Sequence, residues 1–174
     1  MRRTSPILIA GMLGAALVTG AAISAAAVTA PTVVVTATPV PTGIPAQPTE
    51  QQIRDLFKGW DEALATGDPA RVADRYAPDA VLLPTVSNEV RKTPAGIVDY
   101  FDHFLEKKPR GTIKDSTVKI LGDRDAIDTG VYEFTVTEGG VAGKVEARYT
   151  FVYELRDGKW LIVNHHSSQM PEKK

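Results

Sequence analysis

The pair Asp157-Gly158 stands between two long apolar runs near the end of the chain. Aspartate followed by glycine suits a two-residue turn in which both residues have positive φ, so the pair predicts a β-hairpin. The expected strands are 144–155 before the turn and 160–168 after it. This is the strongest local signal in the sequence, and the other elements are considered in relation to it.

Alternation along a strand predicts which side chains of this hairpin share a face. On the second strand one face begins apolar and ends in hydrogen-bonding groups, as expected for a strand that runs from a core into the mouth of a pocket. Its members are Trp160, Ile162, Asn164, His166 and Ser168. On the first strand one face is apolar, and Arg148 points to the opposite face. An arginine and a histidine on neighbouring strands would converge on an anionic or polar ligand.

The N-terminal part of the chain has a different composition from the rest. Two arginines are followed by an uncharged, alanine- and glycine-rich stretch at 7–28, which predicts a signal peptide over 1–30 or an uncleaved membrane anchor. Ala25-Ala26-Ala27 offers small residues for cleavage, and Val35-Thr36-Ala37 is a second option. Residues 31–48 contain Thr, Val and Pro and no charge, which favours an extended linker or a disordered tail. We therefore expect a secreted or extracytoplasmic protein with one folded domain at 49–174.

Composition and motifs exclude several classes of function. The chain has no cysteine, which rules out disulfides, thiol catalysis and thiolate metal sites, and its net charge of −1 implies no general attraction to nucleic acid. No nucleophile elbow, phosphate loop, zinc signature or nucleotide fingerprint is present, so we expect no cofactor and no metal. An enzyme that transfers protons is not excluded, because it needs only a base and donors in an apolar cavity.

Three helices are predicted before most of the strands. Thr49 begins a Thr-x-x-Gln capping box, and Asp68-Pro69 and Thr93-Pro94 each combine a cap with a proline at the first helical position. The further strands are expected at 80–83, 112–121 and 126–136. Early helices and a late, mostly antiparallel sheet indicate an α+β fold.

This order of elements, with Gly67-Asp68-Pro69, the motif at 76–81 and the ending at 157–168, resembles the nuclear transport factor 2-like, or SnoaL-like, superfamily. Within it the chain is most similar to the calcium/calmodulin-dependent protein kinase II association domain, and the bacterial SgcJ/EcaC group has nearly the same pattern. The resemblance covers about 49–171. It implies a cone-shaped, curved sheet wrapped around three N-terminal helices, a pocket between them, and dimers through the sheet or larger rings.

In the kinase domains the pocket is lined by arginines and a histidine and accepts small carboxylates. His166 matches the second histidine of the terminal motif, whereas Arg148 does not coincide with an arginine of the kinase pattern. The resemblance therefore implies a small-molecule ligand and self-association. From the net charge we expect no nucleic acid partner, and from the N-terminal composition we expect membrane contact only through an uncleaved N-terminal segment.

The predicted site combines these residues with aromatic side chains that have polar ends. The expected ligand-binding residues are Trp60, Tyr76, Tyr100, Arg148, Asn164 and His166. Three functions remain open: a binding or oligomerisation module for an anionic or carbonyl ligand, a cofactor-independent isomerase, cyclase or oxygenase with His166 as candidate base, and a purely structural homo-oligomer with a vestigial pocket. Asp61 and Asp99 are further candidate bases, or else solvated helix carboxylates. His165 is expected at the surface or at a subunit interface.

Overall fold

The computed structural model describes residues 47–172, so the predicted leader at 1–30 and nearly all of the linker at 31–48 lie outside the described residues. The elements are α1 (Glu50–Ala65), α2 (Pro69–Ala73), β1 (Tyr76–Leu83), α3 (Pro94–Leu105), β2 (Arg110–Ile120), β3 (Asp125–Glu138), β4 (Val141–Arg156) and β5 (Lys159–Gln169). Within 47–172 no helix is both long and apolar enough to span a membrane.

The helices begin where their caps predict. The side chain of Thr49 accepts a hydrogen bond from the Gln52 backbone N–H at 3.2 Å, and the Gln52 side chain accepts one from the Thr49 N–H at 2.8 Å. Asp68 caps α2 by accepting from the Ala70 backbone N–H, Thr93 caps α3 by accepting from that of Gly96, and each cap is followed by proline. Local side chain–backbone bonds therefore satisfy amide groups that the first turn of a helix leaves free.

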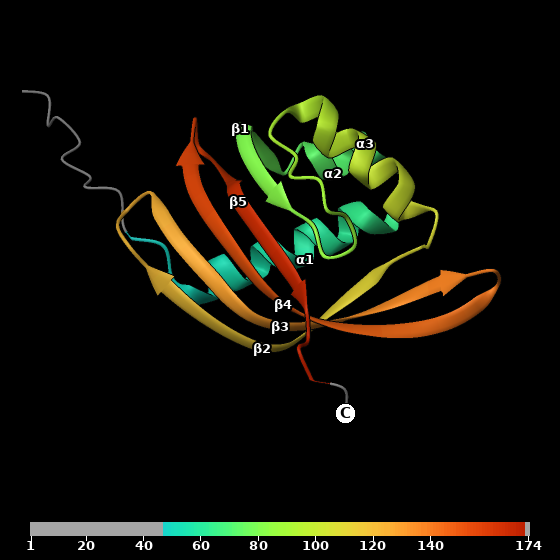
Figure 1. The fold of residues 1–174 in the computed structure, drawn as a ribbon. Helices are drawn as coiled ribbons and strands as arrows, with labels where there is room; N and C mark the ends of the chain where they lie inside the picture. The colour runs from blue at the N-terminus through green and yellow to red at the C-terminus, as the bar shows by residue number, and fades with distance from the viewer. Residues whose placement is uncertain (1–46, 173–174) are drawn as a thin grey trace, which may run out of the picture. The chain divides into compact units, whose positions relative to one another are not determined.

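The sheet has the strand order β1-β5-β4-β3-β2. β1 runs parallel to β5, and every other neighbouring pair is antiparallel. The three helices lie on one face of this bent sheet (Figure 1). The predicted α+β class and mostly antiparallel sheet are thus confirmed. β1 starts earlier than the predicted strand at 80–83, because Tyr76 already pairs with Ile162 of β5.

The turn between β4 and β5 has the predicted conformation. Asp157 and Gly158 have φ values of 51° and 77°, the positive pair that a two-residue hairpin turn requires. Gly139 and Gly140 join β3 to β4 with φ values of 57° and 82°. The terminal hairpin is therefore confirmed.

A β-bulge in β5 reverses the predicted alternation of side chains. Val152 pairs with Asn164, but its neighbour Tyr153 pairs with Ile162, so Val163 is an extra residue without a partner of its own. One extra residue moves every following side chain to the opposite face. The prediction that Ile162, Asn164 and His166 share one face is therefore wrong.

The residues that face the core after the bulge are His165 and Ser167, which are 3% and 5% exposed. The expectation that His165 lies at the surface is thus also wrong. The helix-covered face of the sheet carries a buried, largely aromatic core, in which Trp60 of α1 contacts Phe101, Phe134 and Phe151.

Candidate functional site

A cavity of about 110 Å³ lies on the helix-covered face of the sheet. Side chains from α1, β1 and the loop after it, α3 and the turn after it, and strands β3, β4 and β5 line it. The apolar part of the lining includes Leu82, Phe101, Phe104, Phe134 and Ala147. The polar part consists of Thr85, Tyr100, Lys107, Tyr132, Glu138, His165 and Ser167. A concave apolar space with a few polar groups is the usual form of a small-molecule site.

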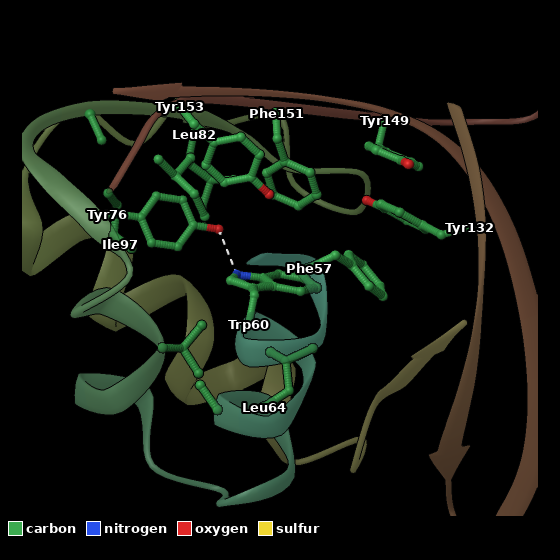
Figure 2. Close-up of a cluster of buried hydrophobic side chains, with 14 of the residues drawn as sticks. Phe57, Trp60, Leu64, Tyr76, Leu82, Ile97, Tyr132, Tyr149, Phe151 and Tyr153 are labelled. Carbon is green, nitrogen blue, oxygen red and sulfur yellow. Dashed lines mark hydrogen bonds between the residues drawn. The ribbon is translucent and has the colours of Figure 1, made fainter. Parts of the chain in front are cut away.

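A chain of hydrogen bonds among three buried side chains leads to this cavity. Nε1 of Trp60 donates to the hydroxyl of Tyr76 at 3.1 Å, the bond drawn as a dashed line in Figure 2. The same hydroxyl lies 2.9 Å from Nδ1 of His165. Trp60 and His165 line the cavity, whereas Tyr76 does not line it and is connected to it through His165. The three residues come from α1, β1 and β5, and only the folded chain brings them together.

The imidazole of His165 is uncharged at neutral pH. Its ring stacks on Phe151 with ring centroids 4.1 Å apart and meets Trp60 edge-on at 5.5 Å. Burial in this aromatic setting, with a smaller contribution from neighbouring His166, lowers the pKa of His165 to about 3. A histidine with so low a pKa is a poor base at neutral pH.

The other ring nitrogen of His165, Nε2, is buried and has no hydrogen-bond partner among the described protein atoms. A buried polar group without a partner costs about 1–3 kcal/mol, so proteins usually pair such groups or use them in a site. In His165, therefore, Nδ1 has a hydrogen-bond partner in Tyr76, and Nε2 has none among the described protein atoms.

Three hydroxyl groups form a second polar cluster at the cavity. Tyr132 donates to Oγ of Ser167, and the same oxygen bonds Oγ1 of Thr85 from the loop after β1. Burial raises the pKa of Tyr132 to about 12, so its phenol stays protonated at neutral pH. The cluster is thus uncharged.

One ion pair is formed between two of the described residues that line the cavity. Nζ of Lys107, just after α3, lies 3.1 Å from Oε1 of Glu138 at the end of β3. Both side chains reach solvent, with side-chain exposures of 37% and 77%. Among the described residues that line the cavity, the charged groups are therefore Lys107 and Glu138, which neutralise each other.

Arg148 and His166 lie together, but not in this cavity. Both are exposed, and they share a shallow hollow with Thr150 and Ser168 on the face of the sheet opposite the helices. Nη2 of Arg148 donates to Oγ of Ser168 at 3.3 Å. Arg148 and His166 thus line the same hollow, but the expectation that this hollow lies under the helices is wrong. The bulge at Val163 is the physical reason that His166 lies on the face opposite the helices. The role of Arg148 and His166 in ligand binding stays a prediction.

The remaining candidates are divided between the cavity and other places. Tyr100 lines the cavity, as Trp60 does. Asn164 is half-buried and lies after the bulge, on the same face as His166. Asp61, expected as a base or a solvated carboxylate, is instead buried and accepts hydrogen bonds from Arg110. Asp99 pairs with Arg91 at 2.6 Å on the surface of α3.

Sequence reasoning missed six polar residues of the cavity: Thr85, Lys107, Tyr132, Glu138, His165 and Ser167. Tyr132 alternates with Phe134 along β3, and this period-two pattern is visible in the sequence. His165 and Ser167 have no such signal, since the four apolar residues at 160–163 hide the bulge. Among residues 47–172 no group of three or more His, Asp or Glu side chains is arranged to hold a metal ion.

Comparison with known proteins first defines the class. A Novosphingobium aromaticivorans structure described as nuclear transport factor 2-like with a cystatin-like fold is 15% identical, covers 71% of this chain and 82% of its own, and has a TM-score of 0.60. The Chlamydomonas reinhardtii calcium/calmodulin-dependent protein kinase II hub homology domain is 17% identical, with coverages of 69% and 96% and a TM-score of 0.57. These similarities establish a nuclear transport factor 2-like fold.

The particular family follows from the sequence. The profile of the calcium/calmodulin-dependent protein kinase II association domain matches residues 49–171. A Xanthomonas campestris structure assigned to the same domain is 58% identical, with coverages of 74% and 93% and a TM-score of 0.72. The chain belongs to the calcium/calmodulin-dependent protein kinase II association domain family. No curated protein sequence matches it significantly.

Proposed function

We propose that this chain is a self-associating domain in which each subunit encloses a small molecule. Membership of an association-domain family and similarity to a hub homology domain support the first part. The observation that carries the second part is the cavity of about 110 Å³, whose walls are apolar and whose polar groups are few and fixed.

The face of the sheet opposite the helices, here called the outer face, is the proposed contact surface between subunits. Cross-strand neighbours share a face, and the outer face carries rows of them across β3, β4 and β5. One row is Ile127, Val152 and Asn164, the next Thr129, Thr150 and His166, and the third Val131, Arg148 and Ser168. Aliphatic side chains together with an arginine and small polar groups suit a contact between proteins. Arg148 and His166 would then contact a second subunit.

Light scattering coupled to size-exclusion chromatography tests self-association. We expect the mass of at least two subunits, and we expect Val152→Glu, which places a charge in the middle of the outer face, to yield monomers. Val90→Glu is the matched control, because Val90 is 40% exposed and lies in the loop between β1 and α3. A wild-type monomer at tens of micromolar, or equal behaviour of the two variants, would contradict the proposal.

The geometry favours binding over the enzymatic alternative. His166 lies outside the cavity, and His165 inside it is uncharged and weakly basic. The carboxylate that lines the cavity, Glu138, is paired with Lys107. Proton abstraction needs a base with a pKa near the working pH, and His165, with a pKa of about 3, is not such a base.

We also propose that the protein is exported, on the basis of the uncharged apolar stretch at 7–28 after two arginines. Mass spectrometry of the N-terminus, after expression in a bacterial host and cell fractionation, tests this. A new N-terminus after Ala25-Ala26-Ala27, or the intact chain in the membrane fraction, is the expected result. Full-length protein confined to the cytoplasm would contradict export.

A further inference from the structure

Six Trp, Tyr and Phe rings are among the described residues that line the cavity. They come from α1, α3 and β3, and they are Trp60, Tyr100, Phe101, Phe104, Tyr132 and Phe134. Some neighbouring rings are nearly perpendicular to each other. The interplanar angle of Trp60 and Phe101 is 74°, and that of Phe104 and Phe134 is 87°. A planar ring placed among perpendicular rings lies edge-to-face to at least one of them, and aromatic pairs prefer that arrangement.

The size of the cavity suits one ring of six carbon atoms. An apolar cavity of about 150 Å³ in another protein binds benzene, and the cavity of this domain has about 110 Å³. Its aliphatic walls, which include Leu82, Val145 and Ala147, also favour a hydrocarbon ring, because the ring leaves water when it enters. Any further atoms of such a molecule must extend out of the cavity.

A recess of about 320 Å³ adjoins the cavity, between α3 and the segment that joins β1 to α3. The two spaces share four lining residues, which are Val86, Tyr100, Phe104 and Lys107. The other residues that line the recess are polar or charged, and they are Ser87, Arg91, Asp99 and His103. An apolar space that leads into a polar one fits a molecule with an apolar body and a polar substituent.

Tyr100 lies where the cavity meets the recess, and its hydroxyl is available to a ligand. No described residue forms a hydrogen bond with this hydroxyl, yet it is not one of the fully buried polar atoms that lack a partner. A small molecule can therefore reach its oxygen. Burial raises the pKa of Tyr100, Tyr132 on the cavity side raises it further, and Arg91 on the recess side lowers it. The hydroxyl is thus close to both spaces and stays protonated at neutral pH, able to donate and to accept.

We propose that the cavity binds a molecule with a single aromatic ring, whose polar substituent lies at the recess and forms a hydrogen bond with the Tyr100 hydroxyl. The ring lies among the six aromatic side chains that line the cavity. This inference rests on the proposed binding function and adds the chemical class of the ligand. The feature that the cavity selects is the aromatic ring, and not the anionic or carbonyl group expected from the sequence.

Phenol and cyclohexanol test the preference for an aromatic ring, because each has six ring carbons and one hydroxyl group. With the purified full-length chain we expect saturable binding of phenol, seen as NMR shifts of the Ala147 methyl group and the Phe134 ring, which both line the cavity. Phenol should bind about tenfold more tightly than cyclohexanol. A tenfold preference corresponds to about 1.4 kcal/mol, which one aromatic pair can supply.

The outcomes separate this inference from the proposed function. If neither probe gives saturable shifts at Ala147 and Phe134, the cavity does not serve as a binding site, and both are overturned. If cyclohexanol binds as tightly as phenol or more tightly, the cavity binds small molecules without selecting an aromatic ring. In that case the proposed function stands and only the present inference fails.

Tyr100→Phe tests the position of the polar substituent, because it removes only a hydroxyl that has no partner among the described residues. This variant should bind phenol about fivefold more weakly, as the loss of one neutral hydrogen bond predicts, and should bind toluene as the wild type does. Tyr153→Phe is the matched control, since Tyr153 also has an unpaired hydroxyl but lines neither the cavity nor the recess. It should change neither affinity. Unchanged phenol binding by Tyr100→Phe would overturn the inference.

Discussion

Acidification below pH 6.5 should destabilise this domain through a single buried side chain, His165. Its folded pKa is about 3, against an ordinary value of 6.5, and burial is the main cause. Between these pH values the unfolded chain binds a proton that the folded chain excludes, so stability is complete above pH 6.5 and falls as the pH falls. The slope approaches 1.4 kcal/mol per pH unit, and the loss over the whole window is about 5 kcal/mol in order of magnitude.

Urea unfolding between pH 7 and pH 4.5 measures this effect before most carboxylates are protonated. His165→Asn, which cannot titrate, should be less stable than wild type at pH 7 but should show a much smaller slope with pH. His166→Asn is the matched control, because His166 is exposed and adjacent in sequence, and it should keep nearly the full slope. Equal slopes in the wild-type protein and His165→Asn would show that His165 is not the group responsible.

Removal of the Asp61 carboxylate should destabilise the fold by about 3 kcal/mol. Asp61 is 8% exposed and joins α1 to the start of β2. Its two oxygens accept from the Gly111 N–H at 2.6 Å and from Nε and Nη2 of Arg110 at 3.1 and 2.7 Å. Asp61→Ala leaves that backbone N–H without its acceptor. The cost lies at the low end for buried ion pairs because the Arg110 side chain is 59% exposed and can be rehydrated.

Thermal or urea unfolding of Asp61→Ala at pH 7 is the measurement, with Glu62→Ala as control. Glu62 is the next residue on α1, its side chain is 62% exposed, and it reaches only a surface lysine at 4.0 Å. We expect the control to stay within about 0.5 kcal/mol of wild type. A loss for Asp61→Ala as small as the control's would show that the helix does not depend on this carboxylate.

The helix starts and the terminal hairpin could be predicted because their signals are local. Thr49, Asp68 and Thr93 bond amides only two or three residues away, and Asp157-Gly158 adopts the backbone angles that its residue types favour. Such contacts do not depend on the rest of the fold. The α+β class then followed from the order of the elements.

The candidate site was predicted only in part. Trp60 and Tyr100 line the cavity as expected, and Tyr76 supports it through its bond to His165. The polar end of β5 was assigned to the wrong face, and the polar cluster of Thr85, Tyr132 and Ser167 joins elements far apart in the sequence. A local sequence pattern does not predict a contact between residues that are far apart in the sequence.

By itself the sequence determined which segments form helices and strands, where they turn and which family the chain resembles. Only the tertiary structure decided which histidine enters the core, because the bulge at Val163 is set by the pairing of β5 with β4 and β1. One unpaired residue reverses the alternation, so it places His165 among aromatic rings beneath the helices and His166 on the outer face.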